Sequence, residues 1–174
     1  MDNPLLYRLF DELRLQIRFA QRAQASLPKV IQNNDPEGVF FYIGAFLAHA
    51  IDVSRLLWPD NPEARERGER LRAELKVTTP SPLELKELRA LLVRSDEKLV
   101  EWAAASEHRN FVQINMMPQG TLAGFQQDVF QRSFDPDTFR GSYQGVPFDV
   151  RLVWKELQRL DLAAQNWLKT HNPW

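Results

Sequence analysis

The stretch "EGVFFYIGAFLAHAIDVSRLLW", Glu37 to Trp58, decides the fold class of this chain. It is apolar on nearly every side up to Ala50, which is typical of a central, buried helix. Asp35 and Pro36 precede it, and we expect them to act as an N-cap and a first-turn proline. The polar segment "PDNP" follows and is expected to end the helix. We therefore predict a helix at the centre of a helical fold.

Further helices are predicted on both sides of this segment. Apolar residues three and four apart predict a helix from about Pro4 to Leu27, which Pro28 and the polar "QNNDP" are expected to end. Asn61 and Pro62 are expected to start a short charged helix whose inward contacts are leucines. The sequence "DVRLVWKELQRLDLAAQNWLK" predicts a last helix. Its predicted buried side consists of Leu152, Val153, Leu157, Leu160, Ala164 and Leu168.

A fourth helix is predicted after the S-x-x-E capping box formed by Ser81, Pro82 and Glu84. Its middle reads "RSDEK", Arg94 to Lys98, with five polar residues in a row. This run is either a chemical site mounted on a core helix or the solvated side of that helix. The predicted buried stripe of the helix consists of Leu85, Leu88, Leu92, Leu99 and Trp102.

The pattern of residue types changes from helical to strand-like between about residues 110 and 148. "FVQINMM" alternates apolar and polar residues, as a half-buried strand does, and "DVFQRSF" and "TFRGSYQGVPF" are rich in residues that favour strands. We predict a small antiparallel β ribbon here. The fold class is therefore mainly α, a bundle of about five helices with this ribbon before the last helix. We expect a single domain over residues 1–174.

Composition excludes several classes of protein and places this chain among ordinary soluble ones. The formal charge of the 174 residues is -1, so any binding of nucleic acid would have to be local. The absence of Cys excludes disulfides, thiolate catalysis and Cys-ligated zinc. The first residues lack the order of a signal peptide, and no uncharged apolar run approaches the ~20 residues needed to span a bilayer. We expect a cytoplasmic protein without a membrane partner.

Three polar residues of the central helix form one candidate site. His49, Asp52 and Arg55 lie at i, i+3 and i+6, so that His49 and Asp52 are neighbours on the helix surface. This pair supplies two metal ligands where three or four are expected. We favour the alternative that hydrogen bonds satisfy the imidazole and that Asp52 pairs with Arg55 or another base. We expect neither a metal nor a cofactor. His108, in the polar "SEHRN", is expected to be a solvated loop residue.

The motifs of the common enzyme classes are missing. The sequence has no G-x-S-x-G elbow and no Gly-rich phosphate loop. Asp96 and Glu97 are adjacent on a predicted helix and point about 100° apart, so they cannot share a substrate from one face.

The order of "LLWP" (56–59), "GERLRAEL" (68–75), "SPL" (81–83) and then "LR" followed by "SDEKL" resembles a group of uncharacterised bacterial helical proteins. Their fourth helix typically reads L-R-N-H-x-E-H-x-D-E-R-[LI]. That segment is similar to the R-x(4-6)-H motif of HEPN domains, which are helical bundles, many of them dimeric and several of them ribonucleases.

The resemblance, carried over by position, matches Arg89 to the motif arginine and places Asp96, Glu97 and Lys98 at D-E-R. Both motif histidines are replaced, the second of them by Arg94. The family implies that a histidine helps to transfer protons during RNA cleavage. A guanidinium cannot replace it, because it keeps its proton near neutrality, but it can bind a phosphate as a forked donor. The resemblance therefore implies a member that has kept the scaffold and lost catalysis.

Two functions remain open. The first is a non-catalytic, dimeric binding or regulatory module that uses Arg89, Arg94 and their neighbours to hold RNA, a nucleotide or a protein partner. The alternative is a metal-independent ribonuclease in which His49 or His108 replaces the missing histidine. Arg89, Arg94, Asp96 and Glu97 could equally form a solvated face or a buried polar network.

Dimerisation is predicted from the aromatic content, which comprises five Trp and eleven Phe. The aromatic-rich segment from Phe125 to Phe148 could present several of these side chains to a second copy. The ordinary alternative is that they cap the open end of the bundle.

Overall fold

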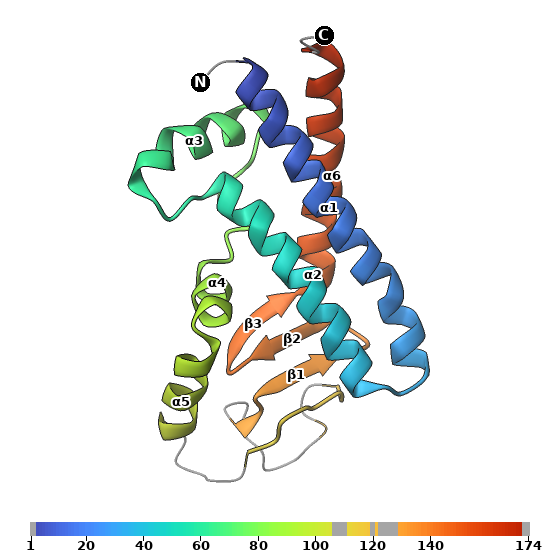
Figure 1. The fold of residues 1–174 in the computed structure, drawn as a ribbon. Helices are drawn as coiled ribbons and strands as arrows, with labels where there is room; N and C mark the ends of the chain where they lie inside the picture. Colours follow the sequence, from blue (N-terminus) through green and yellow to red (C-terminus); the bar gives the residue numbers. More distant parts are fainter. Residues whose placement is uncertain (1–2, 106–110, 119–120, 122–128, 172–174) are drawn as a thin grey trace. The chain divides into compact units, whose positions relative to one another are not determined.

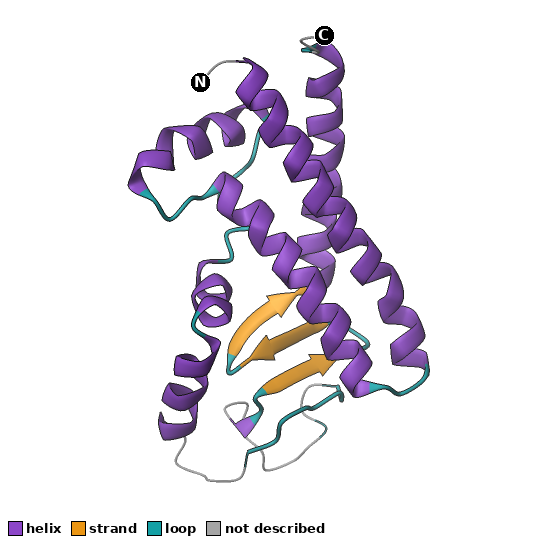
Figure 2. Cartoon of the chain, in the orientation of Figure 1, coloured by secondary structure: helices purple, strands orange, loops and turns teal. Residues whose placement is uncertain are grey.

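The computed structural model describes residues 3–105, 111–118, 121 and 129–171. The fold is mainly α, with a small antiparallel sheet directly before the last helix, as the sequence predicts (Figure 1, Figure 2). The elements in chain order are α1 (Asn3–Gln32), α2 (Pro36–Leu57), the 3₁₀ helix η1 (Pro62–Ala64), α3 (Arg65–Glu74), α4 (Lys86–Val93), α5 (Ser95–Ala105), β1 (Arg132–Asp135), β2 (Arg140–Tyr143), β3 (Val146–Asp149) and α6 (Val150–Thr170).

The chain divides into two compact units. The helical unit comprises Met1–Ser26, Tyr42–Leu85 and Leu152–Trp174, and the sheet unit comprises Leu27–Phe41 and Lys86–Arg151. Each unit therefore combines segments that are distant in sequence. The single domain expected over residues 1–174 stays a prediction, and the two units are described separately below.

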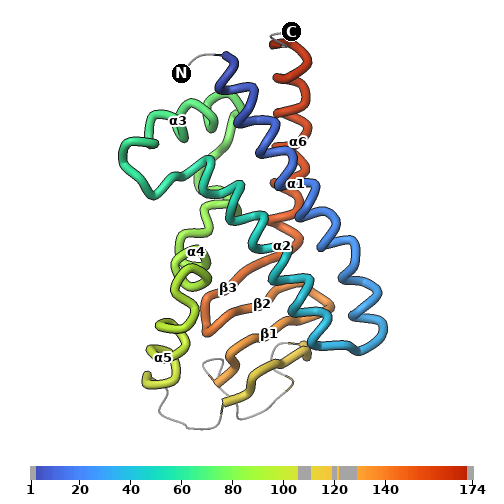
Figure 3. The backbone as a smooth tube through the Cα atoms, in the orientation of Figure 1, coloured from blue at the N-terminus to red at the C-terminus, as the bar shows by residue number. Residues whose placement is uncertain are grey.

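In the helical unit, α1 and α6 run antiparallel and side by side (Figure 3). The Phe10 ring meets the Trp167 ring edge-on at 4.7 Å, and Arg14 Nε donates a hydrogen bond of 2.8 Å to Asp161. The predicted buried side of the last helix is correct except for Leu152, which is 51% exposed. Leu152 lies about 100° around the helix from the buried Val153, so its side chain points away from the core.

The short charged helix after Asn61 is confirmed as η1 followed by α3. The Asn61 side chain caps it by accepting a hydrogen bond of 3.0 Å from the Glu63 N–H. Its two inward leucines, Leu71 and Leu75, are buried. Arg159 of α6 donates to the Leu75 carbonyl at 3.0 Å, which fixes the end of α3 against α6.

The prediction that α1 ends at Leu27 is wrong, because the helix continues through Pro28 to Gln32. Proline removes one backbone hydrogen bond, and here the loss falls close to the end of a long helix with a buried stripe. The helix ends at Gln32, and Asn34, two residues later, has a left-handed φ of 51°. Asn34 N–H donates to Ile31 O and Asp35 N–H to Val30 O, both at 3.0 Å, which is a Schellman motif.

The predicted start of α2 is confirmed. Asp35 Oδ1 accepts a hydrogen bond of 2.9 Å from the Gly38 N–H, and Pro36 occupies the first turn. The most apolar part of α2 is long and apolar enough to cross a membrane by composition alone. Half of that part is buried inside the protein, as in a core helix.

The predicted fourth helix is wrong in its continuity, because α4 and α5 are separate and Arg94 lies between them. Five consecutive polar residues give the chain no apolar side chain to bury at this point. The capping box is also wrong: α4 begins only at Lys86, and Ser81 Oγ accepts from the Leu83 N–H at 3.3 Å within a preceding turn. In the predicted stripe, Leu88 is buried but Leu99 is 37% exposed.

The sheet of the sheet unit has the strand order β1-β2-β3, with both pairs antiparallel. One of its faces buries Phe134, Tyr143 and Phe148. Gly141 sits opposite both phenylalanines, and a Cβ there would collide with the Ser133 carbonyl and the Phe148 ring. The absence of a side chain at Gly141 therefore permits the close packing of β1, β2 and the Phe148 ring.

The prediction that "FVQINMM" forms a strand of the antiparallel ribbon is wrong. Within the described residues this segment makes two isolated bridges, Val112 with Phe130 and Asn115 with Ser133, and both are parallel. Alternation alone does not specify which neighbour a segment pairs with. Phe125, the first residue of the predicted aromatic surface, lies outside the described residues.

Candidate functional site

The seven predicted site residues are divided between the two units. His49, Asp52 and Arg55 lie on α2 in the helical unit, whereas Arg89, Arg94, Asp96 and Glu97 lie on or beside α4 and α5 in the sheet unit. The structure therefore gives two separate groups, each with its own geometry.

Arg89, the residue that matches the HEPN motif arginine, belongs to the protein interior. It is 4% exposed and lies on α4 beside the buried Leu88 and Leu91. A guanidinium so well buried is held by its surroundings and is not presented to solvent. Of the sequence-based alternatives for Arg89, this burial excludes the solvated face.

Arg94 and its neighbours form a solvated surface. The Arg94 guanidinium pairs with the Glu97 carboxylate, and more than half of each side chain is exposed. One turn later, a hydrogen bond and positive charge from Lys98 lower the pKa of Glu101. Asp96 is exposed in the first turn of α5, where a carboxylate suits the positive end of the helix dipole. Exposed pairs of this kind contribute little to stability and leave Arg94 engaged by a carboxylate.

His49 is half-buried and hydrogen-bonded. Its Nδ1 lies 2.8 Å from Gln16 Oε1, and because an amide oxygen only accepts, we assign the proton to Nδ1. The imidazole also packs against the Phe19 ring, with 5.1 Å between the ring centres. Asp52 accepts a hydrogen bond of 3.2 Å from Arg55. This is the hydrogen-bonded arrangement that the sequence favoured over a metal site.

The other histidines add no catalytic group to the described site. His108 lies outside the described residues. His171 stacks on Trp167 near the end of α6, with ring centres 4.3 Å apart and the planes 11° apart. Both described histidines belong to the helical unit. Across residues 3–105, 111–118, 121 and 129–171, no three His, Asp or Glu side chains cluster closely enough to hold a metal ion.

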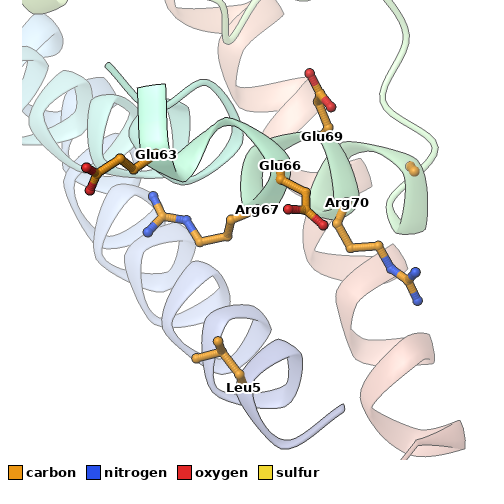
Figure 4. Close-up of a pocket in the computed structure, with 7 residues that line it drawn as sticks. Leu5, Glu63, Glu66, Arg67, Glu69 and Arg70 are labelled. Atoms are coloured by element: carbon orange, nitrogen blue, oxygen red, sulfur yellow. The ribbon is translucent and has the colours of Figure 1, made fainter. Parts of the chain in front are cut away.

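A pocket that the sequence did not reveal lies between the start of α1 and the η1–α3 segment (Figure 4). It has a volume of about 520 Å³. Its charges are mixed, and Arg70 is already paired with Glu74 at 2.8 Å, so it has no strong preference for an ion of either sign. The mixed-charge run "EARERGER" is visible in the sequence but does not by itself predict a pocket. Its lining consists of Leu5, Glu63, Glu66, Arg67, Glu69, Arg70 and Ala73.

A second hollow, of about 390 Å³, lies on the outward side of α1. All of its lining side chains come from this one helix, and two of them are arginines. The apolar spacing of α1 predicts a core helix and gives no signal for a hollow on its outward side. The lining consists of Leu15, Arg18, Phe19, Gln21, Arg22 and Ala25.

Comparison with known proteins found no matching family model, no matching curated protein and no matching solved structure.

Proposed function

We propose that this chain is a non-catalytic, HEPN-like binding or regulatory module that holds a partner and does not cleave RNA. The observation that carries the proposal is the state of Arg94, which stands at the second motif-histidine position. Its guanidinium is paired with Glu97 on an exposed surface. A group that stays protonated near neutrality cannot act as the general base for the ribose hydroxyl. The burial of Arg89 supports the same function, since this arginine is part of the scaffold.

An RNA-cleavage assay tests the proposal. Purified protein is incubated with total RNA, together with the His49→Ala, His108→Ala and Arg89→Ala variants and a ribonuclease as positive control. We expect intact RNA in every sample except the control. Cleavage by the wild type that one of the histidine substitutions abolishes would establish the ribonuclease alternative. Circular dichroism must accompany Arg89→Ala, because removal of a buried side chain can affect folding.

Homodimerisation and a cytoplasmic location remain part of this proposal. Light scattering tests the first: a dimer has twice the monomer mass of 20.3 kDa at micromolar concentration. A monomer mass under these conditions would remove dimerisation from the proposal and leave the non-catalytic assignment intact.

A further inference from the structure

The outward face of α1 differs from the face that packs into the core. Leu13, Ile17 and Ala20 are buried on the inner side. Arg18 and Arg22 are exposed on the outer side and, with their neighbours, enclose the hollow of about 390 Å³. Residues four apart on a helix are surface neighbours with Cβ atoms about 6 Å apart. The two guanidiniums therefore reach solvent from adjacent turns of the same face.

This face is locally positive in a chain whose net charge is -1. From Leu13 to Asn34 the sequence has no acidic residue, and it contains four basic ones. Arg14 is engaged by Asp161 at 2.8 Å. Within the part of the chain that the structure describes, Arg18 and Arg22 pair with no carboxylate. The positive charge of these two side chains is therefore available to an anionic ligand.

An aromatic ring lines the same hollow as the two arginines. Phe19 follows Arg18 directly, precedes Arg22 by three residues, and is 37% exposed. His49 supports the ring at a centre-to-centre distance of 5.1 Å, and Gln16 in turn holds His49 by a hydrogen bond of 2.8 Å. The ring is thus positioned before any ligand arrives. Exposed aromatic rings beside cationic side chains are what proteins use to stack the bases of single strands.

We propose that the outward face of α1, from Leu15 to Ala25, binds single-stranded nucleic acid. Arg18 and Arg22 hold neighbouring phosphates through forked hydrogen bonds, and a base stacks on Phe19. A duplex is disfavoured because its bases are already stacked and cannot use the ring. A membrane surface is disfavoured because Phe19 is the one large exposed apolar side chain among the residues that line the hollow. This site is separate from the motif at residues 89–98 and goes beyond the proposed function.

Fluorescence anisotropy with a labelled single-stranded RNA of about twelve nucleotides tests the site at several salt concentrations. The Arg18→Ala/Arg22→Ala variant is compared with Arg65→Ala/Lys155→Ala, which removes two exposed positive charges elsewhere in the helical unit. We expect the α1 variant to bind at least about tenfold more weakly, because two charge-assisted contacts are lost. The slope of log affinity against log salt should fall by about 1.4, or about 0.7 for each lost phosphate contact. The control variant should bind nearly as the wild type does.

Phe19→Leu separates stacking from charge. It keeps an apolar side chain, and we expect affinity about tenfold lower with an unchanged salt slope. Wild-type protein that binds no RNA, equal losses in the two double variants, or equal affinity for a duplex of the same sequence would each overturn the inference. Binding through Arg18 and Arg22 to phosphatidylserine vesicles, without RNA binding, would assign the face to lipid and likewise overturn it.

The same samples, run on a denaturing gel, report cleavage of the oligonucleotide. Cleaved RNA would contradict the non-catalytic proposal and leave the α1 site intact. Intact RNA, bound with an affinity that the Arg18 and Arg22 substitutions do not change, would contradict the α1 site and leave the non-catalytic proposal intact.

Discussion

The sequence predicts one amphipathic helix at α1 and another over α4 and α5. The structure has a single continuous helix at the first position and two separate helices at the second. α1 keeps its apolar stripe buried and continues for four residues beyond Pro28. The other segment breaks at Arg94, and none of the eleven described residues of α5 is buried. The difference teaches that burial of regularly spaced apolar side chains maintains a helix even across a proline. A run of polar residues provides no such support.

The largest expected effect follows directly from this contrast. Phe10→Ala on α1 removes a fully buried ring and should lower the free energy of unfolding by about 3–5 kcal/mol. Val100→Ala on α5 removes a side chain that is 69% exposed and should change it by less than about 0.5 kcal/mol. Urea denaturation measures both. Similar losses in the two variants would show that α5 is as well packed as α1 and would break the comparison.

Although α5 is exposed, the sheet unit has buried residues of its own. Tyr143, on the sheet, is one of them. Burial raises the pKa of Tyr143 to about 12, against a smaller opposing effect of Arg132. The unfolded chain loses this proton near pH 10 and the folded chain near pH 12. Stability from this group is therefore complete below pH 10 and is lost as the pH rises to 12, by about 2–3 kcal/mol in total.

Tyr143→Phe provides the control for this pH dependence. The urea midpoints of wild type and variant are measured at pH 9 and at pH 11.5. The other tyrosines and the lysines titrate in both proteins, so their contributions drop out of the difference between the two midpoints. A difference that does not change with pH would show that Tyr143 ionises as freely in the folded state as in the unfolded chain.

The next effect compares two arginines of the same segment. Arg89→Ala removes a buried side chain, including its aliphatic stem, and should lower the free energy of unfolding by about 2 kcal/mol. Arg94→Ala breaks an exposed ion pair and should change it by less than about 0.5 kcal/mol. Thermal or urea denaturation checks both variants. A large loss for Arg94→Ala would mean that the polar surface is structurally important.

The smallest expected effect concerns the helix starts. Asp35→Ala removes a true N-cap of α2 and should cost about 1 kcal/mol. Ser81→Ala removes a hydrogen bond of 3.3 Å that lies outside α4 and should cost less. If the two substitutions destabilise equally in urea, Ser81 contributes to the start of α4 after all.

Much of the fold could be predicted from the sequence because its helices carry strong local signals. The cap at Asp35, the cap at Asn61 and the apolar spacing of α1 and α6 depend on neighbours in sequence. The end of α1 could not be predicted in the same way. The stop depends on Asn34 adopting a left-handed conformation, and Pro28 was the more conspicuous but weaker signal.

The candidate site was harder to predict, because accessibility depends on distant packing. The sequence could not distinguish a buried Arg89 from a solvated one, and the structure places it in the interior. His49 and Asp52 were assigned correctly as hydrogen-bonded residues, although Gln16, the partner of His49, is 33 residues away in sequence. The run from Leu13 to Asn34 has no acidic residue, but the helical periodicity of the same segment predicts only the buried, inner face of α1.

Gly141 has a consequence for the evolution of the sheet. Its missing side chain leaves the space that the Phe148 ring and the Ser133 carbonyl occupy. Descendants of this sequence that exchange the buried ring at position 148 for a smaller one would leave a cavity over Gly141. They cannot enlarge position 141, even with a smaller residue at 148, because the backbone of the neighbouring strand stands in the way.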